Sequence, residues 1–410
     1  MFLCVWQAVH LNIPPPGEPP YKQILRRIRW SILAVIAPEM VALNAWLQYR
    51  KATDLMYKVN VYRGLYETRL PEPRLRRLLR CLRYMTGKTG MLCLSPVLVA
   101  DWVRMLVRHR GASRAFEWEQ RELRTNDVLH RLERDELPWA MDTVFYALSG
   151  GGIIMVNGDI MTLNHAAFED FARSHRKDLL PLQRAVLQDP SKASGLTKFI
   201  TCAQALWFCS QCIARLSQDM AISLLELNTF AHCIGAFFIY VFWWHKPYDV
   251  ATHVYIESAQ LTPAQRTFFD LYRYTHQRSK NMAREIFSSY DWAKAGYIRP
   301  LITFLAFLIY GALHSLAWDY HFPTHAEAIV WRCASVATAS SGLVVLLTIV
   351  RNRTKYRGTL VELLHIIAYF LGVVAILTRS FLVVESFRAL PNCPASIYEV
   401  PRWTAYIPHI

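Results

Sequence analysis

Three carboxylates of this 410-residue chain lie within long apolar stretches, where an ionisable side chain is costly to bury and becomes a candidate for function. They are Glu226, Glu39 and Asp142. Apolar surroundings favour the neutral form of a carboxylic acid, so each could hold a proton and donate it to a substrate. The pattern therefore indicates general acid chemistry, with three candidates for the acid.

Two neighbouring apolar stretches predict a specific contact for one of these acids. Phe199–Leu216 and Ile222–Trp244 are separated by a short polar break, which is typical of an antiparallel helical hairpin. Arg215 and Glu226 are equally far from the centre of that break, so we expect them to lie at similar depth and to pair. The pair could belong to a site, or it could hold the two helices together. Helical spacing predicts that the face of the first helix that carries Arg215 also carries Gln204, Trp207 and Gln211. This face is called the Arg215 stripe.

An aromatic face with a histidine at its centre is predicted further along the chain. Tyr310, His314 and Trp318 repeat at intervals of four, which places them on one side of a helix. Because aromatic faces attract cations, this face could line a pocket that stabilises a cationic intermediate. It could equally pack between helices around a histidine whose hydrogen bonds are satisfied.

The elements that must position these residues follow from composition. Hydrophobic residues make up 53% of the chain and charged residues 19%, with a formal net charge of +15. This balance excludes a disordered chain, a coiled coil and an acidic secreted enzyme. The zinc spacings and aromatic–basic strands of nucleic-acid-binding modules are missing, so we expect no nucleic acid partner. Stretches of about 20 apolar residues instead predict helices that cross a membrane.

We therefore predict an all-α fold, a polytopic membrane helical bundle with about seven transmembrane helices, between roughly six and eight. Residues 1–410 should form one integral membrane domain. The clearest spans, apart from the hairpin, are Pro300–Trp318, Ala328–Val350 and Val361–Val384. The less regular candidates are Pro138–Val156, Trp30–Leu47 and Met91–Val107.

Basic residues indicate the orientation, because Lys and Arg concentrate in cytosolic loops. Residues 50–90 contain eleven basic and three acidic residues and are predicted to be a basic cytosolic segment. Residues 245–299 are predicted to be a long cytosolic loop. The basic run Lys22–Arg29 fits this scheme if Trp30–Leu47 takes a re-entrant or interfacial course, kinked at Pro38.

Motifs for metals and cofactors are weak in this sequence. An Asp-rich pair that holds a diphosphate through magnesium is missing, which argues against an ionising prenyl transferase. Cys209 and Cys212 have a redox spacing, but they fall in a predicted membrane helix, where thiols more often pack. Gly150-Gly151-Gly152 follows no predicted strand and so lacks the context of a phosphate-binding loop. We therefore expect no metal site and no cofactor.

Five short motifs along the chain carry a resemblance. They are Trp6-x3-His10-Leu11-Asn12-Ile13-Pro14, Ala37-Pro38-Glu39, Gln204-Ala-Leu-Trp207-x3-Gln211-x3-Arg215, Ser223-Leu-Leu-Glu226-Leu and Trp243-Trp244-x-Lys246-Pro247-x-Asp249-Val250. Together they resemble a large family of multi-pass membrane proteins from filamentous fungi. Most members have no assigned function, some occur in secondary-metabolite gene clusters, and membrane-bound terpene cyclases of the ascochlorin and ascofuranone type are similar to them. The basic region Arg63–Arg114 departs from the family pattern.

The resemblance implies a membrane-bound terpene or meroterpenoid cyclase, which would protonate an epoxide or alkene of a prenylated substrate and quench the resulting carbocation. Glu226 would be the first candidate for the acid, with Glu39 and Asp142 as alternatives. A lipophilic substrate would be bound by polar and aromatic residues at membrane depth: Trp207, Gln211, Arg215, Tyr310, His314 and Trp318.

The expected location is an internal membrane such as the endoplasmic reticulum, with membrane lipids and pathway enzymes on the same membrane as partners. Two other classes of protein remain open. A transporter also needs ionisable groups at membrane depth. A non-catalytic scaffold would use its basic loops on anionic lipid, with the polar pairs serving only as packing.

Overall fold

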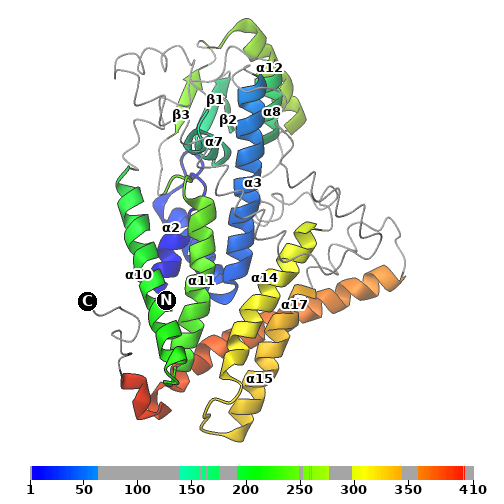
Figure 1. The fold of residues 1–410 in the computed structure, drawn as a ribbon. Coiled ribbons are helices and arrows are strands. Elements are labelled where there is room, and N and C mark those ends of the chain that lie inside the picture. Colours follow the sequence, from blue (N-terminus) through cyan, green and yellow to red (C-terminus); the bar gives the residue numbers. More distant parts are fainter. Residues whose placement is uncertain are drawn as a thin grey trace, which may run out of the picture.

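A computed structural model describes residues 2–62, 139–156, 159–162, 165–174, 192–248, 253–257, 259, 261–276, 298–343, 359–399 and 401. Helices dominate this part of the chain. They form an elongated bundle, with a small sheet and shorter helices at one end (Figure 1).

Two parallel helices form the centre of the bundle, α3 (Pro38–Tyr62) and α11 (Leu224–Trp243). Pro38 lies against Gly235, and Trp243 donates to Gln48 Oε1 at 3.0 Å, so both helices run in the same direction. Apolar residues at helical spacing explain why α3 is buried on one side. The fully buried ones are Val41, Ala45, Ala52, Leu55 and Val59.

The predicted hairpin is confirmed, with α10 (Lys192–Ser217) packed beside α11. The chain reverses at Asp219, which adopts a left-handed backbone conformation with φ of 56°. Ser223 then starts α11 as its N-cap, because its side chain accepts a hydrogen bond from the N–H of Glu226 at 3.1 Å.

The chain also reverses between α2 (Pro20–Ile36) and α3, whose axes differ by 114°. Pro38 explains the break, since proline has no N–H to donate to the preceding turn. A carbonyl left open at the end of α2, Val35 O, lies 2.7 Å from His232 Nε2 of α11. The kink predicted at Pro38 is thus confirmed. The Pro38 ring packs against Gly235 in the middle of α11.

A second group of helices contains α14 (Ile298–His314), α15 (His325–Ser340) and α17 (Thr359–Arg388). One turn of 3-10 helix, η3 (Ser315–Ala317), continues α14. Gly311 lets α14 approach α15 closely, because a Cβ at this position would lie 2.2 Å from the backbone nitrogen of Ala339. Two further turns, η4 (Leu390–Asn392) and η5 (Ala395–Tyr398), follow α17.

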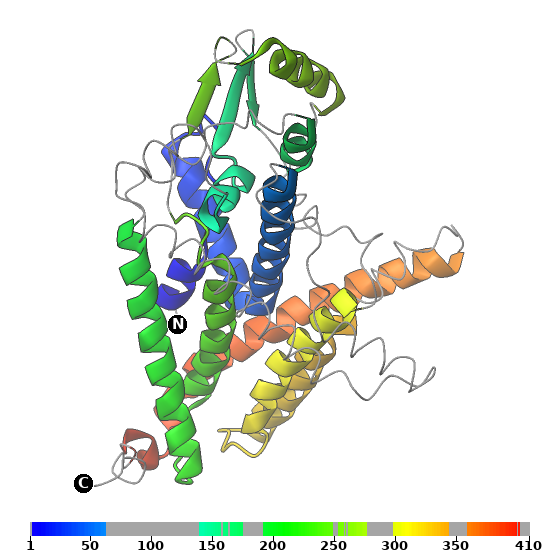
Figure 2. The same cartoon turned by 45° about the horizontal axis from the view of Figure 1, so that its top comes forward.

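A small sheet contradicts the all-α expectation. Its central strand, β1 (Gly152–Val156), pairs antiparallel with β2 (Asp159–Thr162) and parallel with β3 (Val254–Glu257). Figure 2 shows this sheet at one end of the molecule, beside α8 (His165–Ser174) and α12 (Pro263–His276). The protein is therefore mostly helical rather than all-α.

The membrane span predicted at Pro138–Val156 is wrong. This stretch contains a helix of 8 residues, α7 (Met141–Leu148), followed by β1. Gly150 has φ of 93°, and a Cβ on Gly151 would lie 2.3 Å from the Tyr146 ring, so glycines turn the chain tightly here. The apolar run beyond them contains β-branched residues, which suit a strand.

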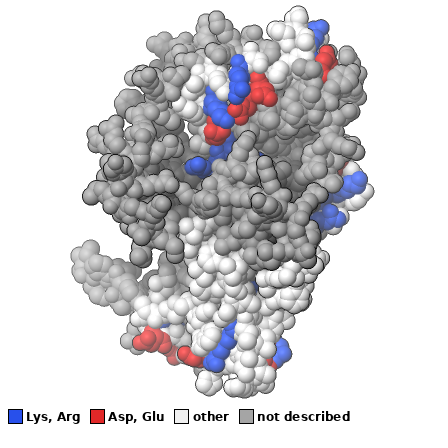
Figure 3. Space-filling view, turned by 90° about the vertical axis from the view of Figure 1, so that its right-hand side faces the viewer, with Lys and Arg blue, Asp and Glu red and all other residues white. Residues whose placement is uncertain are grey.

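Two described helices are long and apolar enough to cross a membrane, α11 and the Tyr369–Arg388 part of α17. The bent pair of α2 and α3 makes a third if it counts as one span, and α14 is apolar but shorter. On one face of the molecule, Figure 3 shows a band of uncharged described side chains above the charged groups at the lower edge. The predicted span Met91–Val107 and residues 63–90 lie outside the described residues.

Candidate functional site

A pocket of about 160 Å³ lies at the turn end of the α10–α11 hairpin. Three residues selected from the sequence line it together, Gln211, Arg215 and Glu226. Its remaining walls are mostly apolar. Phe208 and Cys212 of α10 form one side, and the segment that follows α17 forms the other with Ile397, Tyr398, Glu399 and Pro401.

The predicted pairing of Arg215 with Glu226 is confirmed. Arg215 Nη1 donates to Glu226 Oε1 at 2.9 Å. The second carboxylate oxygen, Oε2, accepts from the backbone N–H of Ser223 at 2.9 Å and from its hydroxyl at 3.0 Å. Glu226 therefore closes a capping box at the start of α11 while its side chain remains 26% exposed at the pocket.

Arg215 also joins the hairpin to the segment after α17. Its Nη2 donates to the carbonyl of Ser396 at 3.3 Å and to the carbonyl of Ile397. Both carbonyls belong to η5, whose residues cover the pocket. The guanidinium thus has two sets of acceptors, the Glu226 carboxylate and a pair of backbone carbonyls.

Glu39, a second predicted acid, is buried in the middle of the bundle. It forms an ion pair with Arg379 of α17, and the side chains are 5% and 4% exposed. The Arg379 guanidinium also lies over the rings of Phe307 and Tyr310, at 5.1 Å and 5.3 Å from their centres. The aromatic face predicted to attract a cation therefore holds the cation of Arg379.

His314 lies beside Tyr310 as predicted, with ring centres 4.9 Å apart. Its Nδ1 lies 2.9 Å from the carbonyl of Tyr310, and its Nε2 lies 3.4 Å from Asn228 Oδ1. Trp318 does not join them, because η3 replaces the regular helix before it; its indole is exposed beside Arg332. The predicted face is thus a pair of buried rings within an interhelical network.

Asp142, the third predicted acid, lies at the other end of α11 from Glu226. Its carboxylate is 2.6 Å from His245 Nδ1, and the aspartate side chain is 54% exposed. At 1.5 Å per helical residue, the acids near the two ends of α11 are about 28 Å apart. The three carboxylates therefore occupy three levels of the bundle and cannot act on one substrate atom.

Trp207, which the sequence places on the stripe with Gln211 and Arg215, points outward from α10 and is 56% exposed. A helical stripe is wide enough that its edge can face away from the partner helix. Trp207 is therefore not a wall of the pocket, and the adjacent Phe208 lines it instead.

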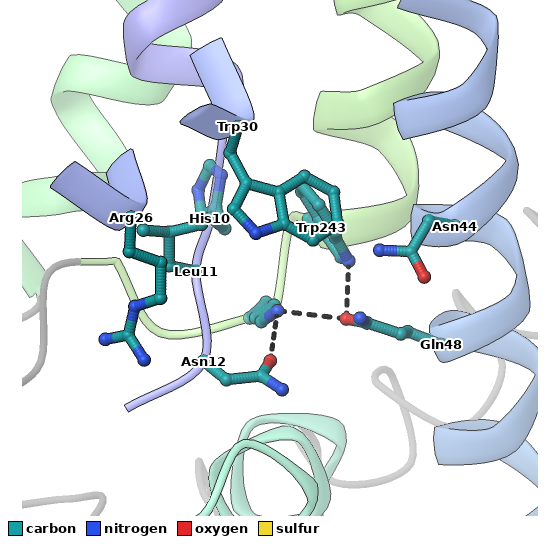
Figure 4. Close-up of a pocket in the computed structure, with 9 residues that line it drawn as sticks. His10, Leu11, Asn12, Arg26, Trp30, Asn44, Gln48 and Trp243 are labelled. Atoms are coloured by element: carbon teal, nitrogen blue, oxygen red, sulfur yellow. Dashed lines mark hydrogen bonds between the residues drawn. The ribbon is translucent and has the colours of Figure 1, made fainter. Parts of the chain in front are cut away.

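A second polar cluster lies near the start of the chain, where two motifs that are distant in sequence meet. Lys246 is 1% exposed, and its Nζ donates to Asn12 Oδ1 at 2.8 Å and to Gln48 Oε1 at 2.9 Å. Figure 4 shows Asn12 and Gln48 converging there from different elements, with Trp243 above them. The space between these residues is about 20 Å³, room for about one water molecule.

His10 and Lys198 add to the electrostatics of this cluster. Burial, followed by the positive charge of Lys198, lowers the pKa of His10 well below its usual value. Burial likewise lowers the pKa of Lys198 to about 8, and its Nζ donates to the carbonyls of Trp244 and Lys246. The sequence carried a signal for this cluster, since the motifs around His10 and Lys246 both stood out, but nothing local indicated their contact.

Within the described ranges, no group of three or more His, Cys, Asp or Glu side chains is placed to hold a metal ion. Cys209 and Cys212 lie on α10 and are not joined in a disulfide.

The described part of the chain defines a mostly helical protein with two or three candidate membrane spans. The chain belongs to a family described as "Family of unknown function (DUF8562)", whose profile matches residues 1–63, 92–264 and 296–410. The match contains the pocket at the hairpin turn, the Glu39–Arg379 pair and the cluster around Lys246. It omits the arginine-rich stretch at 74–83. No curated protein and no solved structure matches the chain.

Proposed function

We propose that this protein is a membrane-bound terpene or meroterpenoid cyclase of fungal secondary metabolism, which starts cyclisation of a prenylated substrate by protonating an epoxide or an alkene. The observation that carries the proposal is the pocket at the hairpin turn, in which Glu226 lies beside Arg215 and Gln211. A carboxyl group that is partly exposed at a mostly apolar pocket can reach a lipophilic molecule bound there.

Glu226 is a better acid for this role than Glu39 or Asp142. Glu39 is enclosed by the interior ion pair with Arg379. Asp142 is more than half exposed, so water can compete with a bound substrate for its proton. Among the three, Glu226 alone lines the 160 Å³ pocket.

In the proposed reaction, neutral Glu226 transfers its proton to the epoxide oxygen or to one carbon of the alkene. The epoxide C–O bond, or the π bond, breaks and leaves a carbocation on the substrate. A second double bond of the substrate attacks this cation and closes a ring, and loss of a proton to the Glu226 carboxylate restores the acid. Phe208 and Tyr398 are the aromatic walls of the pocket, and their rings would stabilise the cation.

Arg215 would position Glu226 and the substrate in the pocket. Its Nη1 donates to Glu226 Oε1 at 2.9 Å, which fixes the direction of the carboxyl group. Its Nη2 donates to the carbonyls of Ser396 and Ile397 in the same arrangement. These contacts anchor Arg215 beside the pocket, where Gln211 would help to orient the substrate.

The wider setting belongs to the same proposal. A bundle with about seven spanning helices would hold the pocket at a membrane, and the endoplasmic reticulum or another internal membrane would supply the lipophilic prenylated substrate. Membrane lipids and other enzymes of the pathway on the same membrane are the proposed partners.

Glu226→Gln tests the proposal, because glutamine can still complete the capping box but cannot donate the proton. Membranes that contain this variant should lose cyclisation of an epoxy-prenyl substrate while the protein remains folded. Ser223→Ala is the matched control: it weakens the cap but keeps the acid, so cyclisation should persist.

Unchanged cyclisation by Glu226→Gln would remove Glu226 from the mechanism. If wild-type membranes produce no cyclised product, solute flux in reconstituted vesicles would indicate a transporter. Loss of partner recruitment on neutralising residues 50–90, with unchanged metabolites, would indicate a scaffold.

A further inference from the structure

One face of α2 is uncovered, and that face is apolar. Its exposed side chains fall within an arc of about 100°, at 100° per helical residue. They are Tyr21, Ile24, Leu25, Ile28 and Ile32. Trp30 and Ala34 on the opposite face are buried against the bundle. α2 therefore packs on the bundle with one side and presents a continuous apolar stripe on its outer side.

Basic side chains border this stripe. Lys22 and Arg29 are exposed and lie on the same edge of it, about 80–100° from Tyr21. Arg27, on the other edge, is held over the rings of Trp6 and Tyr248. The exposed charge next to the stripe is therefore positive, from Lys22 and Arg29.

The position of α2 relates this surface to the candidate membrane spans. Its first half reaches the end of α11 that carries His245, because Arg27 contacts Tyr248 there. Its last residue precedes Pro38, which lies against Gly235 in the middle of α11. Since α11 is a candidate span, α2 descends from one membrane face to mid-depth, and α3 returns toward the same face.

We propose that the outer face of α2 is a binding surface for anionic phospholipids. The apolar stripe contacts acyl chains, and Lys22 and Arg29 contact the negatively charged headgroups. A helix with an apolar face and basic borders binds an anionic lipid surface through both effects. The proposal is independent of the cyclase reaction.

Lipid binding is tested on the full-length protein in nanodiscs of phosphatidylcholine with or without phosphatidylglycerol, followed by native mass spectrometry of the released protein. Wild type should retain phosphatidylglycerol in preference to phosphatidylcholine. The double variant Lys22→Glu/Arg29→Glu should lower that preference on the order of tenfold. Arg50→Glu is the control, because Arg50 is also an exposed cation but lies on α3, away from the stripe.

Equal retention by the double variant, or an equal loss in Arg50→Glu, overturns the proposal. A second measurement does not depend on any variant. Wild type in discs that contain phosphatidylglycerol with a photoreactive acyl chain should become cross-linked within residues 21–32. Absence of lipid cross-links in α2, or cross-links from α2 to a second copy of the protein, also overturns it.

Discussion

Glu39 and Arg379 form an ion pair in the interior of the bundle, although one lies near the start of the chain and the other near its end. Arg379 also donates to the carbonyl of Ile36 at 3.3 Å and to the hydroxyl of Ser341 at 3.2 Å. One guanidinium thus ties the bend between α2 and α3 to the group of α14, α15 and α17. The charges of Glu39 and Arg379 are both removed from water, so each charge is stabilised by the other.

Breaking this pair should be costly. Arg379→Met leaves a buried carboxylate without its partner and is expected to lower the free energy of unfolding by about 3–5 kcal/mol. The double variant Glu39→Leu/Arg379→Met should lose much less than the sum of the single losses, because neither charge remains. Denaturant unfolding in detergent micelles measures the cycle, and additive losses would contradict a mutual dependence of the two charges.

The N-cap of α11 should contribute stability separately from any reaction at Glu226. Ser223→Ala removes the cap and should lower the free energy of unfolding by about 1 kcal/mol. Glu226→Gln should lose less than Glu226→Ala, because glutamine keeps the reciprocal hydrogen bond to the backbone of Ser223. Thermal unfolding of the three variants under one detergent condition provides the comparison, and equal losses for Gln and Ala would disprove the capping role.

The close approach of α14 and α15 should depend on Gly311. A methyl group there would fall within 2.6 Å of three atoms of Ala339, so Gly311→Ala should destabilise the protein by about 1–3 kcal/mol. Gly372→Ala is the matched control within α17, where a Cβ meets nothing within 4 Å. That change should be neutral or stabilising by up to about 1 kcal/mol, since alanine favours a helix. The same loss in both variants would show that backbone propensity, not contact, governs Gly311.

The buried amine of Lys198 should make the free energy of unfolding change with pH in the alkaline range. Its pKa falls from 10.5 to about 8 on folding, so between these values the unfolded chain binds more protons than the folded one. Stability from this group therefore rises with pH, by roughly 2 kcal/mol between about pH 7.5 and about pH 10. Lys198→Met should be less stable, since two carbonyls lose their donor, but should lack this rise. Parallel pH profiles of the two proteins would contradict the assignment.

Local sequence features predicted the parts of the structure that depend on neighbours along the chain. The symmetry of the α10–α11 hairpin about its turn placed Arg215 opposite Glu226, and the structure has this pair at 2.9 Å. Pro38 predicted the break between α2 and α3 because a missing N–H acts within one helical turn. The strand at Gly152–Val156 was missed, since a short apolar run has the same composition in a strand and in a membrane helix.

The sequence by itself therefore determined the mostly helical class, the hairpin, the kink and one ion pair, because each follows from helical periodicity or from the chemistry of single residues. Only the tertiary structure decided which polar groups share a site. It paired Glu39 with Arg379, brought Asn12 and Gln48 to Lys246, and laid the segment after α17 over Glu226. These contacts join residues far apart in the chain, and the packing of distant segments sets their distance, so no local spacing records them.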